Sequence, residues 1–576
     1  MRALVGCLAA VCILTPIAGE PASAQTAGQI TPSTLQPAPP TARPVVALPE
    51  SGPGEAPVGA GGLTVRLAGV DVTGTLAGFE QTTAALLEPL AGRDVSVAAL
   101  FAAAGALERA YASKGYLLAR VIVPAQTLED GGRMSLVVLD GFIERIDDSA
   151  LPARVRARIA AVTGSLVGRR SIRRDDIERR LLIAGETPGT ALRSILKRGA
   201  EKGGAVLVLE TDHRPVSGSV GFDNGMSDAL GNWRMTSSFE LNSVAGRGEQ
   251  LYLGFAGHPT LSDTIGFFAS DPRNRSIGGG ATLPIGSDGL LVNLEAIRTD
   301  ASPRPDPAAP TFSSSFERYS ARLRYPFLKS RAFALSTEVA FDVIQDRVDT
   351  IAPTATSLSL DELRVLRASV NLSIASPWDD AVSARIAFAH GLDAFGARAA
   401  SDATAVLPLS REGADSDFRK VEAVLSWSRQ VADHLAVGAT TAAQWSFGDP
   451  LPGSEMFSPA LSSSSLGFDM GSIQGDAGYW LRGEIASPWS FATGHGLDLT
   501  LEPYTFGGIG QVWLEEPTAA ERASTRLGSI GAGLRLGTAA ATDPRRFDVS
   551  FEWARQYRSG SEDEEDRFTS LATFRF

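Results

Sequence analysis

Side chains that could carry out chemistry are few and widely spaced in this sequence. Its only cysteines are Cys7 and Cys12, near the start of the chain. The run Gly531-Ala532-Gly533 lacks the following helix that a dinucleotide-binding site requires. The five histidines do not recur at the spacing of metal ligands; they are His213, His258, His390, His434 and His495. We therefore predict that the chain is not an enzyme and holds no metal ion and no cofactor.

The first 24 residues have the features of a secretory signal peptide. Arg2 supplies a positive charge, residues 4–17 form an apolar run, and Ala22-Ser23-Ala24 is a small-residue cleavage site. Cleavage there removes both cysteines, so disulfides are not expected. Gln25 follows, where a lipoprotein would need a cysteine. The net charge of −12 argues against binding to nucleic acid.

Residues 25–60 are rich in Pro, Ala, Gly and Thr, which is typical of a flexible, partly polyproline linker. Their proline content argues against a helix in this stretch. After the signal peptide no run of 18 apolar residues occurs. A chain of this kind can span a membrane only with strands, because a closed barrel is the one alternative to helices that satisfies every backbone hydrogen bond.

Residues 61–141 have the pattern of a small α+β module, and residues 142–212 repeat it. Each has the order strand, helix, helix, strand, strand. Ser96 is placed to cap the second helix of the first module, and Gly115 stands where a left-handed residue ends it. Ser171 is placed to cap the corresponding helix of the second module. The predicted helices are residues 79–90, 96–113, 152–163 and 172–184, and the predicted closing strands are 117–123, 134–139, 192–196 and 205–209.

Residues 216–576 alternate apolar and polar side chains in about 16 segments, as in a membrane barrel with a wet lumen. In one segment Met235 and Phe239 alternate with Arg234 and Glu240. Short connections alternate with long polar ones, as periplasmic turns alternate with outer loops, and the longest covers residues 448–477. All eight tryptophans fall in this half, typical of membrane interfaces. We predict an all-β, 16-stranded antiparallel transmembrane barrel.

Several motifs accompany this organisation. They are Tyr111–Tyr116, Ala119–Gln126 and Val137–Gly141 in the first module, and Gly221–Asn224, Leu283–Gly286, Arg324–Phe327, His390–Leu392 and Arg482–Pro488 in the barrel. With two modules ahead of a 16-stranded barrel, they resemble the two-partner secretion transporters (TpsB, the haemolysin and filamentous-haemagglutinin transporter family) of the BamA superfamily. The resemblance covers nearly the whole chain after the signal peptide. The terminal aromatic residues, Phe574 and Phe576, are similar to the signal that the barrel assembly machinery reads.

The resemblance implies that the two modules are polypeptide-transport-associated (POTRA) modules that hold an unfolded client. Strand edges near residues 119–124 and 205–209 are candidate places where an extended client adds as a further strand. The matching motif residues, to which the resemblance carries client binding, are Tyr111, Gly115, Tyr116, Arg120, Pro124 and Gln126.

The resemblance also implies that the sixth loop, residues 448–477, folds into the barrel. In the family an arginine of this loop pairs with an aspartate of strand 13; here Leu466 and Gly508 stand at these places. Because a lone buried charge costs roughly 3–5 kcal/mol, losing both partners together is physically coherent. Arg482-Gly483 imitates the lost motif, but the stretch that continues to Pro488 is similar to strand 12 of the family and the turn after it, so we place Arg482 on that strand. We expect the loop to dock through Leu466, Gly467 and Phe468 against Phe506, Gly508 and Gly510.

The resemblance implies an outer-membrane translocator that captures an unfolded exoprotein with its periplasmic modules and exports it through the barrel. Two alternatives stay open: an insertase that folds other barrels into the membrane, and a porin-like channel with periplasmic domains. The expected partners are the secreted client, the barrel assembly machinery during biogenesis, and outer-membrane lipid or lipopolysaccharide. The chain itself is expected to be a monomer.

Overall fold

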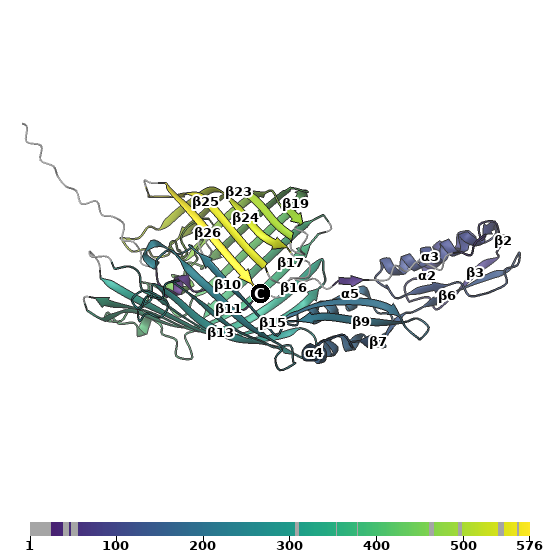
Figure 1. Cartoon of the computed structure of the whole chain (residues 1–576), viewed down its shortest axis with the longest axis horizontal. Coiled ribbons are helices and arrows are strands. Elements are labelled where there is room, and N and C mark those ends of the chain that lie inside the picture. The colour runs from purple at the N-terminus through teal and green to yellow at the C-terminus, as the bar shows by residue number, and fades with distance from the viewer. Residues whose placement is uncertain are drawn as a thin grey trace, which may run out of the picture.

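A closed barrel of antiparallel strands forms the C-terminal part of the chain, and two α+β modules extend from one end of it (Figure 1). The computed structural model describes residues 25–37, 45–47, 56–305, 310–352, 354–376, 378–459, 466–492, 498–539, 546–561 and 564–576. The predicted signal peptide lies outside these residues. In the described part of the chain, no helix combines the length and the apolar character needed to cross a membrane.

The first module confirms the predicted order of elements. Its sheet has the order β3-β6-β5, with β3 and β6 parallel, beside the separate pair β2–β4. The Ser96 hydroxyl accepts a hydrogen bond from the Ala99 N–H at 3.2 Å, and Gly115 ends the helix at φ +94°, as predicted. The elements are β2 (Thr64–Arg66), β3 (Gly69–Thr73), α2 (Glu80–Leu87), η1 (Glu88–Leu90), β4 (Asp94–Ser96), α3 (Val97–Ser113), β5 (Arg120–Ile122) and β6 (Arg133–Leu139).

The second module has the same order, with β9 in the middle of its sheet between β8 and β7. The interpretation of residues 205–209 as a free edge is therefore wrong, because they lie in β9. The Ser171 cap is also wrong: the Ser171 N–H and hydroxyl both donate to the Asp140 carboxylate, and the helix begins at Arg174. The elements are β7 (Phe142–Asp147), α4 (Ala153–Thr163), η2 (Gly164–Leu166), α5 (Arg174–Gly185), β8 (Thr190–Arg198) and β9 (Gly204–His213).

The barrel wall has sixteen strand positions, as predicted, because β21 and β22 pair in succession with β23 and share one position. Ser487 and Pro488 interrupt this twelfth strand; the prediction that they form the turn after it is wrong. Beside the interruption, the His434 ring stacks on Trp489 with centroids 3.8 Å apart, and His434 Nδ1 lies 2.8 Å from the Pro488 carbonyl oxygen.

The barrel strands are β10 (Val216–Asp223), β11 (Arg234–Asn242), β12 (Gln250–Gly257), β13 (Asn274–Ile285), β14 (Leu290–Ala301), β15 (Thr311–Lys329), β16 (Phe333–Ala352), β17 (Thr356–Ala375), β18 (Asp380–Gly391), β19 (Arg419–Ala432), β20 (Leu435–Trp445), β21 (Ala477–Ala486), β22 (Trp489–Ala492), β23 (Asp498–Trp513), β24 (Ser524–Ala539), β25 (Arg546–Arg558) and β26 (Glu565–Arg575). Short 3-10 turns η3 (Asp228–Leu230), η4 (Ala400–Asp402) and η5 (Gly453–Glu455) lie in outer loops.

The predicted alternation fixes which side chains face the bilayer. On β11, Met235 and Phe239 are exposed on the outer face, whereas Arg234 turns inward to bond the buried carboxylate of Asp223 at 3.1 Å. The first and last strands close the wall, since β10 pairs with β26. Phe576 extends this seam, because its N–H and carbonyl oxygen both bond the backbone of Gly218, at 3.0 and 3.1 Å.

The prediction of a flexible linker over residues 25–60 is wrong at its start. Residues 25–37, which we call the lumenal segment, run inside the barrel and include the one-turn helix α1 (Ala27–Ile30). Ala27 and Ile30 are buried among side chains of β14–β18 and of the outer loops. Further along, β1 (Val45–Ala47) pairs in parallel with β8 and extends the sheet of the second module.

Gly141, the last residue of the first module, passes close to Leu118, whose side chain packs in the core of the second module, and it should not tolerate a side chain. A Cβ atom there would lie 2.0 Å from the Leu118 carbonyl oxygen. We expect Gly141→Ala to destabilise the joint by about 1–3 kcal/mol, because the backbone must shift to relieve the overlap. Hydrogen exchange on the full chain should show faster exchange in β5 and β7. Gly164→Ala, where a Cβ meets nothing within 4 Å, is the matched control; equal exchange in both variants would contradict this account.

Candidate functional site: an occupied lumen and two sheet edges

The lumenal segment is held to the inner wall along its whole length. Near the outer end, Gln25 donates to the Met470 carbonyl oxygen at 2.8 Å, and the Ala27 N–H donates to the Ser314 hydroxyl at 2.8 Å. Gln29 donates to the side chain of Gln474 at 2.7 Å. Because Met470 and Gln474 belong to loop six, the two segments that fill the lumen also hold each other.

A buried carboxylate fixes the inner end of the segment. Glu295 on β14 accepts from the Thr34 hydroxyl at 2.8 Å and from the Leu35 N–H at 2.9 Å. Arg318 and Arg322 on β15 approach the same carboxylate at 3.4 and 3.2 Å and also donate to the carbonyl oxygens of residues 32 and 33. Arg318 and Arg322 thus bind both the wall carboxylate and the backbone of residues 32 and 33, and this tethers the segment to the wall.

Loop six packs on the wall where the sequence predicted. Leu466 is fully buried, and its Cδ2 lies 2.3 Å from the position that a Cβ on Gly508 would take. Its Cδ1 lies 3.4 Å from the corresponding position on Gly510. Gly467, at φ +80°, directs its carbonyl oxygen toward the Gln556 amide. The structure therefore brings these residues together, and Phe468 is buried beside them.

Phe506 is the one predicted docking residue that the structure assigns elsewhere. The Arg482 guanidinium lies 3.6 Å from the centroid of its ring and pairs with the buried Glu552 carboxylate at 2.6 Å. Arg482 lies on β21, directly opposite Gly508 on β23. The rejection of Arg482 as a loop-six residue agrees with this position, and its charge is neutralised within the wall.

Two buried ionic contacts of loop six were missed by the sequence analysis. Glu455 receives Arg367 from β17 and Lys420 from β19, the latter at 2.9 Å. Asp476 is fully buried and accepts from Arg411 and from the N–H groups of Leu451 and Glu515, both at 2.7 Å. The sequence feature that could have indicated these contacts is a carboxylate near each end of loop six, Glu455 and Asp476. Among the described residues no three His, Cys, Asp or Glu side chains gather as a metal site.

The motif residues of the first module are mostly structural. Tyr111 is fully buried and packs on Phe79, with ring centroids 4.3 Å apart, so no client can reach it. Gly115 lies at the joint between modules, where its carbonyl oxygen accepts from the Arg174 N–H at 2.7 Å. Tyr116 lies at the same joint, 5.9 Å from the Arg173 guanidinium.

The remaining motif residues lie on the β5 side of the first module. Arg120 donates to the carbonyl oxygens of Leu117 and Ala119, at 2.9 and 2.8 Å. The Gln126 side-chain amide bonds both the N–H and the carbonyl oxygen of Ser135, at 2.7 and 2.9 Å, and thereby continues the β5–β6 ladder. Pro124 lies between them and has no N–H to offer a partner strand. The predicted edge at residues 119–124 is correct, since β5 is the last strand of its sheet.

The second module is tied to the periplasmic turns of the barrel. Arg179 donates to the Pro326 carbonyl oxygen at 2.8 Å, and Arg180 pairs with Asp288 at 2.7 Å. Arg158 bonds the Gly286 carbonyl oxygen, where burial lowers the pKa of its guanidinium. These turns contain the motifs quoted from the sequence, so the motifs mark a docking surface for α4 and α5.

The contact between Leu466 and Gly508 predicts that a single methyl group will loosen loop six. Gly508→Ala places a carbon inside the Leu466 side chain, so we expect the loop to undock in a measurable fraction of molecules. Ion conductance in planar bilayers should rise several-fold. Destabilising the docked state of loop six by about 1–3 kcal/mol increases the fraction of molecules in which the loop is undocked. Gly507→Ala is the control, since its Cβ meets only the Ser529 carbonyl oxygen at 4.0 Å. Leu466→Ala combined with Gly508→Ala should restore closure, and a double variant as leaky as the single one would contradict the contact.

Comparison with known proteins agrees with this geometry. The family model of the haemolysin secretion/activation protein ShlB/FhaC/HecB matches residues 203–536, and that of the ShlB-type POTRA domain matches residues 65–141. The outer membrane transporter CdiB of Escherichia coli is 24% identical over 445 residues, covering 76% of this chain and 71% of its own. The hemolysin transporter protein ShlB of Serratia marcescens is 22% identical over 488 residues, covering 79% and 76%.

Solved structures share the fold. CdiB from Escherichia coli superposes with a TM-score of 0.67 at 20% identity, covering 96% of this chain and 94% of its own. CdiB from Acinetobacter baumannii gives a TM-score of 0.57 at 13% identity, covering 89% and 90%. With the family model matching more than half of its length, a barrel closed by β10 and β26, and a POTRA module ahead of it, this chain belongs to the ShlB/FhaC/HecB family of haemolysin secretion/activation proteins.

Proposed function

We propose that this chain is the outer-membrane translocator of a two-partner secretion system, which captures an unfolded exoprotein in the periplasm and passes it through the barrel. The observation that carries the proposal is that the lumen is filled by two separate segments, each held to the wall by hydrogen bonds or ion pairs and by an apolar cluster. The hydrogen bonds and ion pairs can be exchanged for water or for a client backbone at little net cost, so a segment is able to leave while the wall stays closed.

Client capture is best supported at the edges of the two module sheets. β5 ends the sheet of the first module, and β8 carries only the three-residue β1 outside it in the described part of the chain. β8 spans nine residues, of which Arg193, Ser194 and Ile195 pair with β1. An extended client that pairs along more of β8 makes more main-chain hydrogen bonds than β1 does, whatever its sequence. In this proposal β1 occupies the edge of β8 to which a client strand binds, and it is an internal stand-in for the client in that sense.

Capture and opening are connected through the chain itself. Seven residues, 38–44, join the lumenal segment to β1, and they span at most about 25–30 Å. The segment ends near the periplasmic side, where Gln36 donates to Thr282 at 3.3 Å. Displacing β1 from β8 frees the anchor that lies next to this end, so the segment is able to leave toward the periplasm. Folding of the client outside the cell then supplies direction.

The occupied lumen disfavours the porin-like alternative, which needs a permanently open passage. The insertase alternative is less favoured because the family model is that of secretion proteins. Phe574 and Phe576 lie at the closing seam, with ring centroids 6.1 Å apart, which supports a role as the signal for the barrel assembly machinery. Contact with that machinery and a monomeric state belong to the same proposal.

Removing residues 61–212 tests the need for capture. We expect the truncated chain to remain a heat-modifiable barrel in the membrane, because the wall closes on itself through β10 and β26. Export of the cognate exoprotein should fall below detection. The measurement is secreted exoprotein in the culture medium, with barrel content checked on the same membranes. Export at the full-length level would contradict capture by the modules.

Locking β1 onto β8 tests the stand-in model directly. Ala47 and Ile195 are register partners, so Ala47→Cys with Ile195→Cys should form a disulfide. In a background with Cys7 and Cys12 replaced by Ser, these are the only thiols. We expect oxidised cells to lose export about tenfold or more, corresponding to about 1.4 kcal/mol, and reductant to restore it. The two single-cysteine variants serve as controls, and full export with the disulfide formed would rule out displacement of β1.

A further inference from the structure

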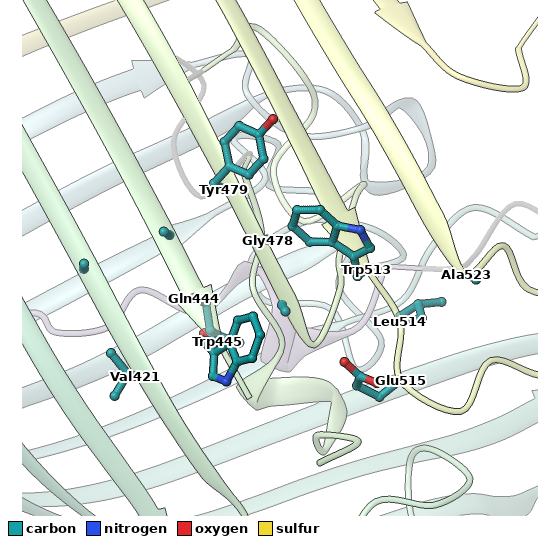
Figure 2. A pocket seen from close by; sticks show the side chains of 12 residues that line it. Val421, Gln444, Trp445, Gly478, Tyr479, Trp513, Leu514, Glu515 and Ala523 are labelled. Atoms are coloured by element: carbon teal, nitrogen blue, oxygen red, sulfur yellow. The ribbon is translucent and has the colours of Figure 1, made fainter. Parts of the chain in front are cut away.

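An apolar groove of about 660 Å³ lies on the outer face of the barrel wall, across the outer ends of β19, β20, β21 and β23. Figure 2 shows Trp445, Tyr479 and Trp513 around it, with Leu514 and Glu515 at one end. Trp445 is 62% exposed, whereas its neighbour Gln444 is buried in the lumen. The aromatic side chains of the groove therefore face the bilayer.

The floor of the groove is made of small side chains. Ala423 lies opposite Ala443 in the β19–β20 register, and Ala477 lies opposite Trp513 in the β21–β23 register. Small residues let an apolar partner approach the backbone closely, so van der Waals packing can hold it even where lipid competes. Tyr479 and Trp513, with ring centroids 5.9 Å apart, form the adjoining wall.

The groove has a polar end and an apolar end. Just beyond the residues that line the groove, Arg419 lies on the same face of β19 as Val421, two residues closer to the outside; its side chain is 57% exposed and pairs with Asp449 at 3.6 Å. Toward the bilayer centre, Leu481 and Ile509 lie opposite each other and are exposed. The order from outside inward is thus cation, aromatic ring and aliphatic surface, which matches the order of phosphate, interface and acyl chain in a lipid.

We propose that this groove binds lipopolysaccharide, with one acyl chain between Trp445 and Tyr479 and a lipid A phosphate at Arg419. The occupant follows from position, because the groove continues the lipid-facing surface and lies in the outer leaflet, where lipopolysaccharide is the lipid. Glu515 accepts from a hydroxyl or amide N–H near the head of the chain. Behind the groove, Gln444 donates to the carbonyl oxygens of Glu455 and Asp476, so the bound lipid braces the wall that anchors loop six.

The test is lipid retention by the full-length chain, extracted from outer membranes, washed in mild detergent and analysed by native mass spectrometry. We expect the unaltered chain to keep lipopolysaccharide. Ala443→Phe, which fills the groove, and Arg419→Ala, which removes the cation, should each lower retention about tenfold. Ala368→Phe is the matched control, because Ala368 is an exposed, lipid-facing position on β17 away from the groove, and it should retain the unaltered level.

Heat-modifiable migration establishes that each variant is folded. If Ala443→Phe does not assemble, Arg419→Ala carries the test, since its side chain lies at the exposed rim. Equal retention by the unaltered chain and by all three variants would overturn the site. Retention of phospholipid in place of lipopolysaccharide, lost in the same two variants, would overturn the assignment of the ligand.

Discussion

The closing pair of β10 and β26 is the contact on which every other feature depends. A strand edge left unpaired in a bilayer exposes N–H and carbonyl groups that lipid cannot bond. Five register pairs from Ser219–Arg575 to Asp223–Leu571 close this edge, and Phe576 adds its own two backbone bonds to Gly218. Once the wall is continuous, its inward side chains enclose a lumen, and the lumenal segment and loop six can fill it.

That space is filled by ionic contacts as well as by apolar clusters. Wall carboxylate Glu295 receives Thr34 and Leu35 of the lumenal segment, and loop-six carboxylate Glu455 receives Arg367 and Lys420 of the wall. Removing one partner of such a contact leaves an uncompensated charge, whereas moving a whole segment exposes both partners to water. The lumen is thus stable when closed and able to open segment by segment.

Features that depend on the local periodicity of apolar side chains could be predicted from the sequence. Contacts between residues far apart in the chain could not. Alternation along residues such as 233–241 is a property of the strand itself, so the barrel and its sixteen positions followed. Leu466 and Gly508 could be matched because both depart from one family motif. The Arg367–Glu455 contact joins residues 88 positions apart and leaves no local signal. The lumenal segment was misjudged because its partners lie more than 200 residues away in the chain, as Gln25 with Met470 and Ser33 with Arg322 show, and composition carries no signal of such contacts.

At the interruption formed by Ser487 and Pro488, a stacked pair of rings, His434 on Trp489, stands beside the backbone ladder. Ring stacking lacks the cooperativity of consecutive main-chain bonds, since each ladder bond holds its neighbours in register. Thermal fluctuations of the barrel should therefore start at this periplasmic corner and spread along β22. The amides of residues 489–492 are then the first of the wall to exchange with deuterium, well before those of the long strands β15–β17.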